Sequence, residues 1–175
     1  DKMERKDILK YIEEFNMAKI QAVSDIMRLQ TYSEWGGVAY TSHERAEVKI
    51  QDGCDRFCTY CIIPYARGPV RSRKLEEIVS EVQKLANAGT KEVVITGIHI
   101  SSYGKDLKED VSLIDVLEKI NNIDKIERIR LGSLEPIIIT EEFVDRLKKL
   151  RKICNHFHLS TYGFLIAKYA VIWAS

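Results

Sequence analysis

Apolar positions between residues 46 and 160 alternate between two rhythms. Short runs rich in β-branched residues predict strands over residues 48–51, 92–96, 126–131 and 157–160. Between these runs, apolar residues recur at three- and four-residue spacing, which predicts helices over residues 75–85, 113–120 and 140–150. Strands that alternate with helices are typical of right-handed βα units on a parallel sheet. The pattern therefore predicts an α/β fold.

The two ends of the chain depart from this rhythm. An apolar stripe predicts a helix over residues 4–15. We therefore divide the chain into four segments: an N-terminal helical remnant (1–19), a linker (20–45), the α/β core (46–160) and a mostly apolar tail with a single charge (161–175).

Residues whose side chains can take part in catalysis or ligand binding follow the predicted strands. In a parallel sheet, the carboxyl ends of all strands lie at one edge, where functional loops gather. We therefore expect four sets of residues to share one rim: Gly53 with the cysteines, Gly97 with His99, Ser133 with Glu135, and Ser160.

Three cysteines, Cys54, Cys58 and Cys61, lie within eight residues, whereas Cys154 stands alone. Such clustering favours a metal or iron–sulfur site in a reducing compartment over a disulfide framework. Three protein ligands also leave one coordination position open for chemistry. A zinc site is the alternative, completed by one of three side chains: Cys154, His43 or His99.

Overall charge changes this interpretation little. The chain has 27 basic and 26 acidic residues, so net charge argues neither for nor against a nucleic-acid partner. The compact basic cluster Arg67, Arg71, Arg73 and Lys74 predicts either contact with RNA phosphates or a solvated loop. We find no signal peptide and no run of apolar residues long enough to cross a membrane, and we expect a cytoplasmic protein.

Three stretches of sequence resemble the tRNA methylthiotransferases, a family of radical S-adenosylmethionine (SAM) enzymes. They are residues 50–68 (IQDGCDRFCTYCIIPYARG), residues 96–104 (TGIHISSYG) and residues 130–136 (RLGSLEP). The Thr-Gly-Ile-His form is most similar to the branch that acts on threonylcarbamoyladenosine beside the tRNA anticodon. The resemblance implies a partial parallel (β/α) barrel of the radical SAM type, preceded by the helical remnant.

The resemblance also implies a role for each matching residue. Cys54, Cys58 and Cys61 would ligate a 4Fe–4S cluster, Tyr60 would lie against the adenine of SAM, and Gly97 would lie where the amino group of SAM is held. Three further residues are candidates for contacts along this cofactor: Ser133, Glu135 and Ser160.

The function implied by the resemblance is radical methylthiolation of a tRNA adenosine, with flavodoxin or ferredoxin as electron donor. Members of the family also carry an N-terminal domain with three further cysteines, additional βα units and an RNA-binding domain, so we expect this chain to be a fragment. The alternatives are a non-catalytic iron–sulfur or zinc-binding fragment, or methylthiolation of another tRNA adenosine or of a ribosomal protein. The sequence leaves the oligomeric state open.

Overall fold

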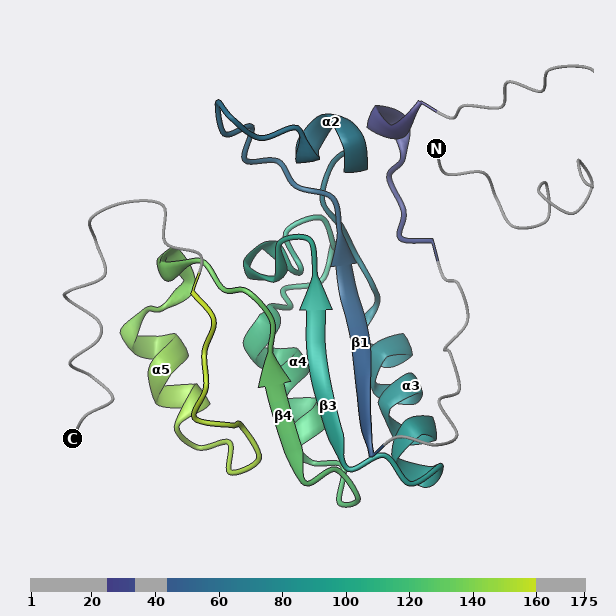
Figure 1. Ribbon diagram of the computed structural model, residues 1–175, viewed down its shortest axis with the longest axis vertical. Coiled ribbons are helices and arrows are strands. Elements are labelled where there is room, and N and C mark those ends of the chain that lie inside the picture. Colours follow the sequence, from purple (N-terminus) through teal and green to yellow (C-terminus); the bar gives the residue numbers. More distant parts are fainter. Residues whose placement is uncertain (1–24, 34–43, 160–175) are drawn as a thin grey trace, which may run out of the picture.

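A four-stranded sheet forms the centre of the computed structural model, which describes residues 25–33 and 44–159 (Figure 1). The strands lie in the order β2-β1-β3-β4 and span Arg71–Ser72 (β2), Arg45–Asp52 (β1), Glu92–Gly97 (β3) and Arg128–Leu131 (β4). β1, β3 and β4 are parallel, as the sequence predicts, whereas β2 pairs with β1 in the antiparallel direction. The predicted helix over 4–15, the tail over 161–175 and Ser160 lie outside the described residues.

Helices connect the parallel strands. The α-helices span Ile63–Arg67 (α2), Leu75–Asn87 (α3), Leu113–Asn121 (α4) and Glu141–Leu147 (α5). α3 and α4 pack against each other and on the sheet, and α5 packs on α4 (Figure 1). Short 3-10 helices span Ile26–Arg28 (η1), Ile100–Ser102 (η2) and Pro136–Ile138 (η3). Within the predicted linker, η1 lies beside α2 (Figure 1).

The core joins the sheet to the apolar stripes of α3 and α4. Its fully buried members include Val48, Ile50, Val93, Ile95 and Ile129 from the strands, and Ile78, Val82, Leu117 and Ile120 from the helices. Burying one such side chain stabilises a fold by roughly 1.5–3 kcal/mol. The helices begin where the sequence provides caps: Thr140 accepts a hydrogen bond from the Phe143 N–H, and Ser112 forms a capping box with Asp115.

One buried carboxylate joins the three parallel strands near their amino ends. Glu92 of β3 is paired in register with Arg45 of β1 and Arg128 of β4. Its oxygens lie 2.6 Å from Arg45 Nε, 2.7 Å from Arg128 Nε and 2.8 Å from Arg130 Nε. Hydrogen bonds from these arginines, above all Arg128, lower the pKa of Glu92 to about 2 despite its burial.

The prediction of a fourth strand over 157–160 is wrong for residues 157–159. The segment from Ile153 to Leu159 forms two isolated bridges, Ile153 with Ile129 of β4 and Leu159 with Leu134, which lies beyond the end of β4. The bridges are five residues apart on one side and six on the other, so the register shifts between them. A continuous ladder needs a constant register, and none forms here.

Within the described residues, no helix combines the length and the apolar character that crossing a bilayer requires.

Replacing Glu92 with glutamine tests the electrostatic clamp. A carboxylate whose pKa is lowered by folding stabilises the protein above its unfolded pKa and loses this effect as pH falls through the folded pKa. The shift from 4.5 to about 2 corresponds to about 3 kcal/mol, reduced by solvent screening at the partly exposed arginines. We expect Glu92→Gln to lower the free energy of unfolding by about 2 kcal/mol at pH 7.

Urea denaturation at pH 7, 4.5 and 3 measures this difference, which should shrink below pH 4.5 and become small near the folded pKa of about 2. Glu127→Gln is the matched control, because Glu127 is half-exposed and its contacts are longer, 3.5 Å to Lys91 Nζ and 3.6 Å to Arg128 Nη1. A loss of stability at pH 3 equal to that at pH 7 would contradict the electrostatic explanation.

Candidate functional site

Loops that follow β1, β3 and β4 meet at the carboxyl edge of the sheet. Arg56 from the first loop and His99 from the second both contact Glu135 from the third. The Glu135 N–H also donates to Ser101 Oγ, at 3.0 Å. The prediction that these three sets of residues share one rim is confirmed; Ser160, the fourth set, lies outside the described residues.

The cysteine loop is closed at its base by the pairing of β1 with β2. Gln51 lies opposite Ser72, and Asp52 lies opposite Arg71, so the chain leaves the sheet and returns to it beside the same strand. Just above this pairing, the Cys54 N–H donates to the Gly68 carbonyl oxygen at 3.0 Å. The base is therefore fixed by backbone geometry, although residues 53–58 have no regular secondary structure.

Gly53 allows the loop to close this tightly. Its φ is +75°, in the left-handed region, and a Cβ at this position would lie 1.8 Å from the Pro69 carbonyl oxygen. No side chain larger than a hydrogen atom fits there without moving the backbone.

The three clustered cysteines differ in exposure. Cys54 is buried, Cys61 is half-buried and Cys58 is exposed. Burial raises the pKa of the Cys54 thiol, as do the negative charges of Glu135, Cys61 and Cys58, against a lowering by a hydrogen bond with the Arg56 backbone. The thiols are therefore near enough to influence one another.

These sulfurs do not converge in this conformation. Among residues 25–33 and 44–159, no group of three or more His, Cys, Asp or Glu side chains is arranged to hold a metal ion. The donor chemistry nonetheless fits an iron–sulfur cluster, because three thiols project from one short loop at a sheet edge.

Cys154 lies away from this loop. Its N–H donates to the Ile129 carbonyl oxygen, toward the amino end of β4, whereas the cysteine loop follows the carboxyl end of β1. The alternative of a zinc site completed by Cys154 is therefore not supported. His43 lies outside the described residues, and His99 is directed toward Ser102 and Glu135.

Aromatic and apolar side chains surround the cysteines. Phe57 packs edge-to-face on Tyr65, with 5.6 Å between ring centroids. Phe57 has a φ of +45°. It is the only non-glycine residue with a left-handed backbone in the part of the chain that the structure describes. Tyr60 and Ile62 are 65% and 69% exposed, so this loop presents apolar surface that a bound group can cover.

Gln51 is a site residue that the sequence analysis missed. Its side chain is fully buried: Nε2 donates to the Asp52 and Gly53 carbonyl oxygens, and Oε1 accepts from the His99 N–H at 2.7 Å. A Cβ at Gly97 would lie 3.0 Å from the Gln51 carbonyl oxygen, so the chain after β3 packs closely on the end of β1. No clear signal marked it in the sequence, because Gln51 falls on the polar side of the Val48-Lys49-Ile50-Gln51 alternation, where a solvent-exposed side chain is expected.

The other predicted cofactor residues occupy the same rim. Glu135 is partly buried, and Ser133 is exposed, with its Oγ 2.7 Å from His158 Nδ1. The roles predicted for Tyr60, Gly97, Ser133 and Glu135 toward a cofactor stay predictions.

Two members of the basic cluster are structural. Arg71, 1% exposed, donates to the Pro69 and Arg67 carbonyl oxygens, and Arg73, 7% exposed, donates to the Lys49 carbonyl oxygen and to Glu81. Charged side chains are buried in this way when carbonyl oxygens and carboxylates satisfy them. Exposed Arg67 is therefore better placed for the predicted RNA contact, which stays a prediction.

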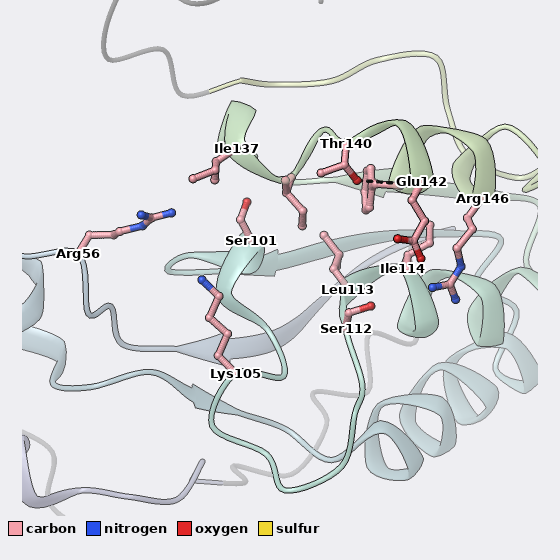
Figure 2. A pocket seen from close by; sticks show the side chains of 12 residues that line it. Arg56, Ser101, Lys105, Ser112, Leu113, Ile114, Ile137, Thr140, Glu142 and Arg146 are labelled. Atoms are coloured by element: carbon pink, nitrogen blue, oxygen red, sulfur yellow. Dashed lines mark hydrogen bonds between the residues drawn. The ribbon is translucent and has the colours of Figure 1, made fainter.

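A pocket of about 410 Å³ opens beside Arg56 (Figure 2). Leu113, Ile114, Ile138 and Phe143 contribute to its apolar lining, and Ser101 and Lys105 lie on the side nearest Arg56 (Figure 2). Arg146, also in the lining, is already paired with Asp115 and Glu118. Lys105 and Arg56 therefore provide the basic groups at this end.

Comparison with known proteins gives a family match over most of the chain. The model of the radical SAM superfamily matches residues 48–164. Threonylcarbamoyladenosine tRNA methylthiotransferase MtaB of Bacillus subtilis (strain 168) is 42% identical over 159 residues, which cover 89% of this chain and 35% of that protein. A tRNA-2-methylthio-N(6)-dimethylallyladenosine synthase of Thermoanaerobacter sp. (strain X514) is 47% identical over 118 residues, covering 67% of this chain and 25% of that protein.

The chain thus spans about a third or less of the length of these curated relatives. Among solved structures, the radical S-adenosylmethionine methyltransferase TsrM of Kitasatospora setae, with tryptophan and a SAM analogue bound, has a TM-score of 0.55 and 18% identity. The match covers 79% of this chain and 28% of that chain. This likeness supports the fold alone, and the relatives confirm the resemblance seen in the three stretches of sequence.

Substituting Gly53 with alanine tests whether the loop base needs a glycine. We expect Gly53→Ala to lower the free energy of unfolding by more than 1 kcal/mol, roughly, because the new Cβ overlaps the Pro69 carbonyl oxygen. Gly89→Ala is the matched control: Gly89 also has a left-handed φ, +103°, but a Cβ there meets no atom within 4 Å. Urea denaturation of both variants measures the difference, and equal losses would show that backbone strain rather than the close approach matters.

Proposed function

We propose that this chain, which belongs to the radical SAM superfamily, holds a 4Fe–4S cluster and SAM at the carboxyl edge of its sheet and serves the methylthiolation of a tRNA adenosine. One observation carries the proposal: three thiols on one loop lie beside polar groups from the two neighbouring strand ends. The family match and the sequence resemblance supply the cofactors.

Each side chain has a distinct part in this proposal. Cys54, Cys58 and Cys61 ligate the cluster, which with SAM supplies one-electron cleavage of a carbon–sulfur bond. Burial of Cys54 keeps water from one side of the ligand set, and the exposed ring of Tyr60 provides a surface for the adenine. Gly97, where no side chain intervenes, is proposed to lie beside the amino group of SAM, and Ser133 and Glu135 line the same rim.

The substrate proposed is N6-threonylcarbamoyladenosine next to the tRNA anticodon. The Thr96–His99 motif and the 42% identity to the Bacillus subtilis relative support this choice. Identity to the dimethylallyladenosine synthase is similar over a shorter span, so another tRNA adenosine is the second candidate. Relatives named for tRNA make a ribosomal-protein substrate the weaker alternative.

Two basic side chains are proposed to contact the tRNA. Arg67 and Lys105 are both exposed, and Lys105 lines the pocket. Both offer positive charge for RNA phosphates, and Lys105 has no ion pair among the described residues. Flavodoxin or ferredoxin is the proposed electron donor.

Formation of deoxyadenosine tests the proposal. After anaerobic reconstitution with iron and sulfide, the chain should convert SAM to deoxyadenosine and methionine in the presence of a strong reductant. We expect Cys58→Ser to reduce the rate by at least about tenfold, because one cluster ligand is lost. Cys154→Ser is the matched control and should leave the rate unchanged, because Cys154 lies away from the loop.

Two outcomes would contradict the proposal: no deoxyadenosine from a reconstituted sample, or equal rates in the Cys58→Ser variant and the unaltered chain. Mass spectrometry of tRNA nucleosides then distinguishes the two adenosine substrates.

A further inference from the structure

Both carboxylate oxygens of Glu135 are engaged by other loops. Oε2 accepts from Arg56 Nη2 at 2.8 Å, and Oε1 lies 2.7 Å from His99 Nε2. Arg56 lies between Cys54 and Cys58 in the cysteine loop, and His99 follows β3. One side chain after β4 therefore joins all three loops of the rim.

His99 is itself held from two other sides. Its N–H donates to Gln51 Oε1 at 2.7 Å, and its Nδ1 lies 2.6 Å from Ser102 Oγ. Its buried Nε2 has no partner in hydrogen-bond geometry among the described residues, and it faces Glu135 at ion-pair distance. A buried polar nitrogen without a partner costs free energy, so the nearby Glu135 carboxylate stabilises the His99 ring in this position.

Glu135 is likewise fixed through its backbone, because its N–H donates to Ser101 Oγ. Its side chain is 28% exposed, compared with 10% for His99 and 36% for Arg56. Contacts through Glu135 thus connect the buried His99 to the more exposed Arg56 of the cysteine loop. Besides Arg56, two residues of the described segment between Cys54 and Cys58 contact later parts of the chain: Asp55 Oδ1 accepts from the Val70 N–H at 3.2 Å, and the Phe57 ring packs on Tyr65.

We propose that Glu135 is a positioning residue for the cysteine loop, anchored by His99 and acting through Arg56, rather than a direct contact of the cofactor. Each carboxylate oxygen already lies against a protein group, at 2.8 Å from Arg56 Nη2 and at 2.7 Å from His99 Nε2, and these contacts connect the cysteine loop to the loop after β3. The proposal rests on the proposed function only for what the loop binds; the tie itself exists without any cofactor.

Hydrogen–deuterium exchange of the cofactor-free chain tests the tie. We expect Glu135→Ala to speed amide exchange in residues 53–62 by roughly tenfold, since a charge-assisted contact that restrains local opening is lost. His99→Ala should do the same to a smaller extent, and the double variant should match Glu135→Ala alone, because His99 acts through Glu135. His99→Gln, whose amide N–H donates to a carboxylate, should restore slow exchange.

Two controls separate a local effect from general loosening. Exchange in residues 92–97 of β3 should be unchanged in every variant, and Glu141→Gln, at an exposed carboxylate in the first turn of α5, should leave residues 53–62 unaffected. Unchanged exchange in Glu135→Ala, or additive effects in the double variant, would overturn the positioning role.

Affinity for SAM in the reconstituted chain adds a second distinction. A direct cofactor contact predicts that Glu135→Ala weakens SAM binding while His99→Ala does not, with loop exchange unaltered in both. The positioning role predicts that both variants weaken SAM binding, and that the variant with the faster loop exchange weakens it more. If the chain takes up no cluster, the proposed function fails while the exchange result still decides the role of Glu135.

Discussion

Parallel pairing of β1, β3 and β4 determines where every candidate functional group of this chain lies. Because the three strands run in one direction, the cysteine loop, His99 and Glu135 emerge at the same edge despite being up to about 80 residues apart in sequence. The β-branched residues buried on these strands provide the driving force for this arrangement. The site depends on that pairing more than on any single contact.

Two carboxylates serve the two ends of the sheet in different ways. Glu92 is nearly fully buried under three arginines and joins the strands at their amino ends. Glu135 is more exposed and has contacts with one arginine and one histidine, and it joins loops rather than strands. The sheet is thus held by a buried clamp at its amino ends, and the loops at its carboxyl edge are joined by a more exposed contact.

The sequence predicted the elements with strong local signals. The runs at 48–51 and 92–96 are strands, and the stripes near 75–85 and 113–120 are helices, because apolar periodicity reports burial directly. Thr140 begins its helix as expected. The rim was predictable because strand direction alone places loops on one edge, and the resemblance supplied the chemistry of the cysteines.

Features that depend on pairing between distant segments were not predictable. β2 has two polar residues, Arg71 and Ser72, and exists only because β1 offers an edge beside it. Arg71 and Arg73 were predicted either to contact RNA phosphates or to lie in a solvated loop, yet both are buried. Arg71 donates to the Pro69 and Arg67 carbonyl oxygens, and Arg73 donates to the Lys49 carbonyl oxygen of β1. The segment over 157–159 has the composition of a strand, but the register shifts between its two bridges to the segment 129–134, and no continuous ladder forms.

We propose that three thiols of one loop hold an iron–sulfur cluster with one iron left open. Mössbauer spectroscopy of the chain, reconstituted anaerobically with isotopically enriched iron, is the decisive measurement. We expect a 4Fe–4S spectrum in which addition of SAM changes the signal of a single iron. A spectrum without a cluster, in a sample that instead retains stoichiometric zinc, would contradict it.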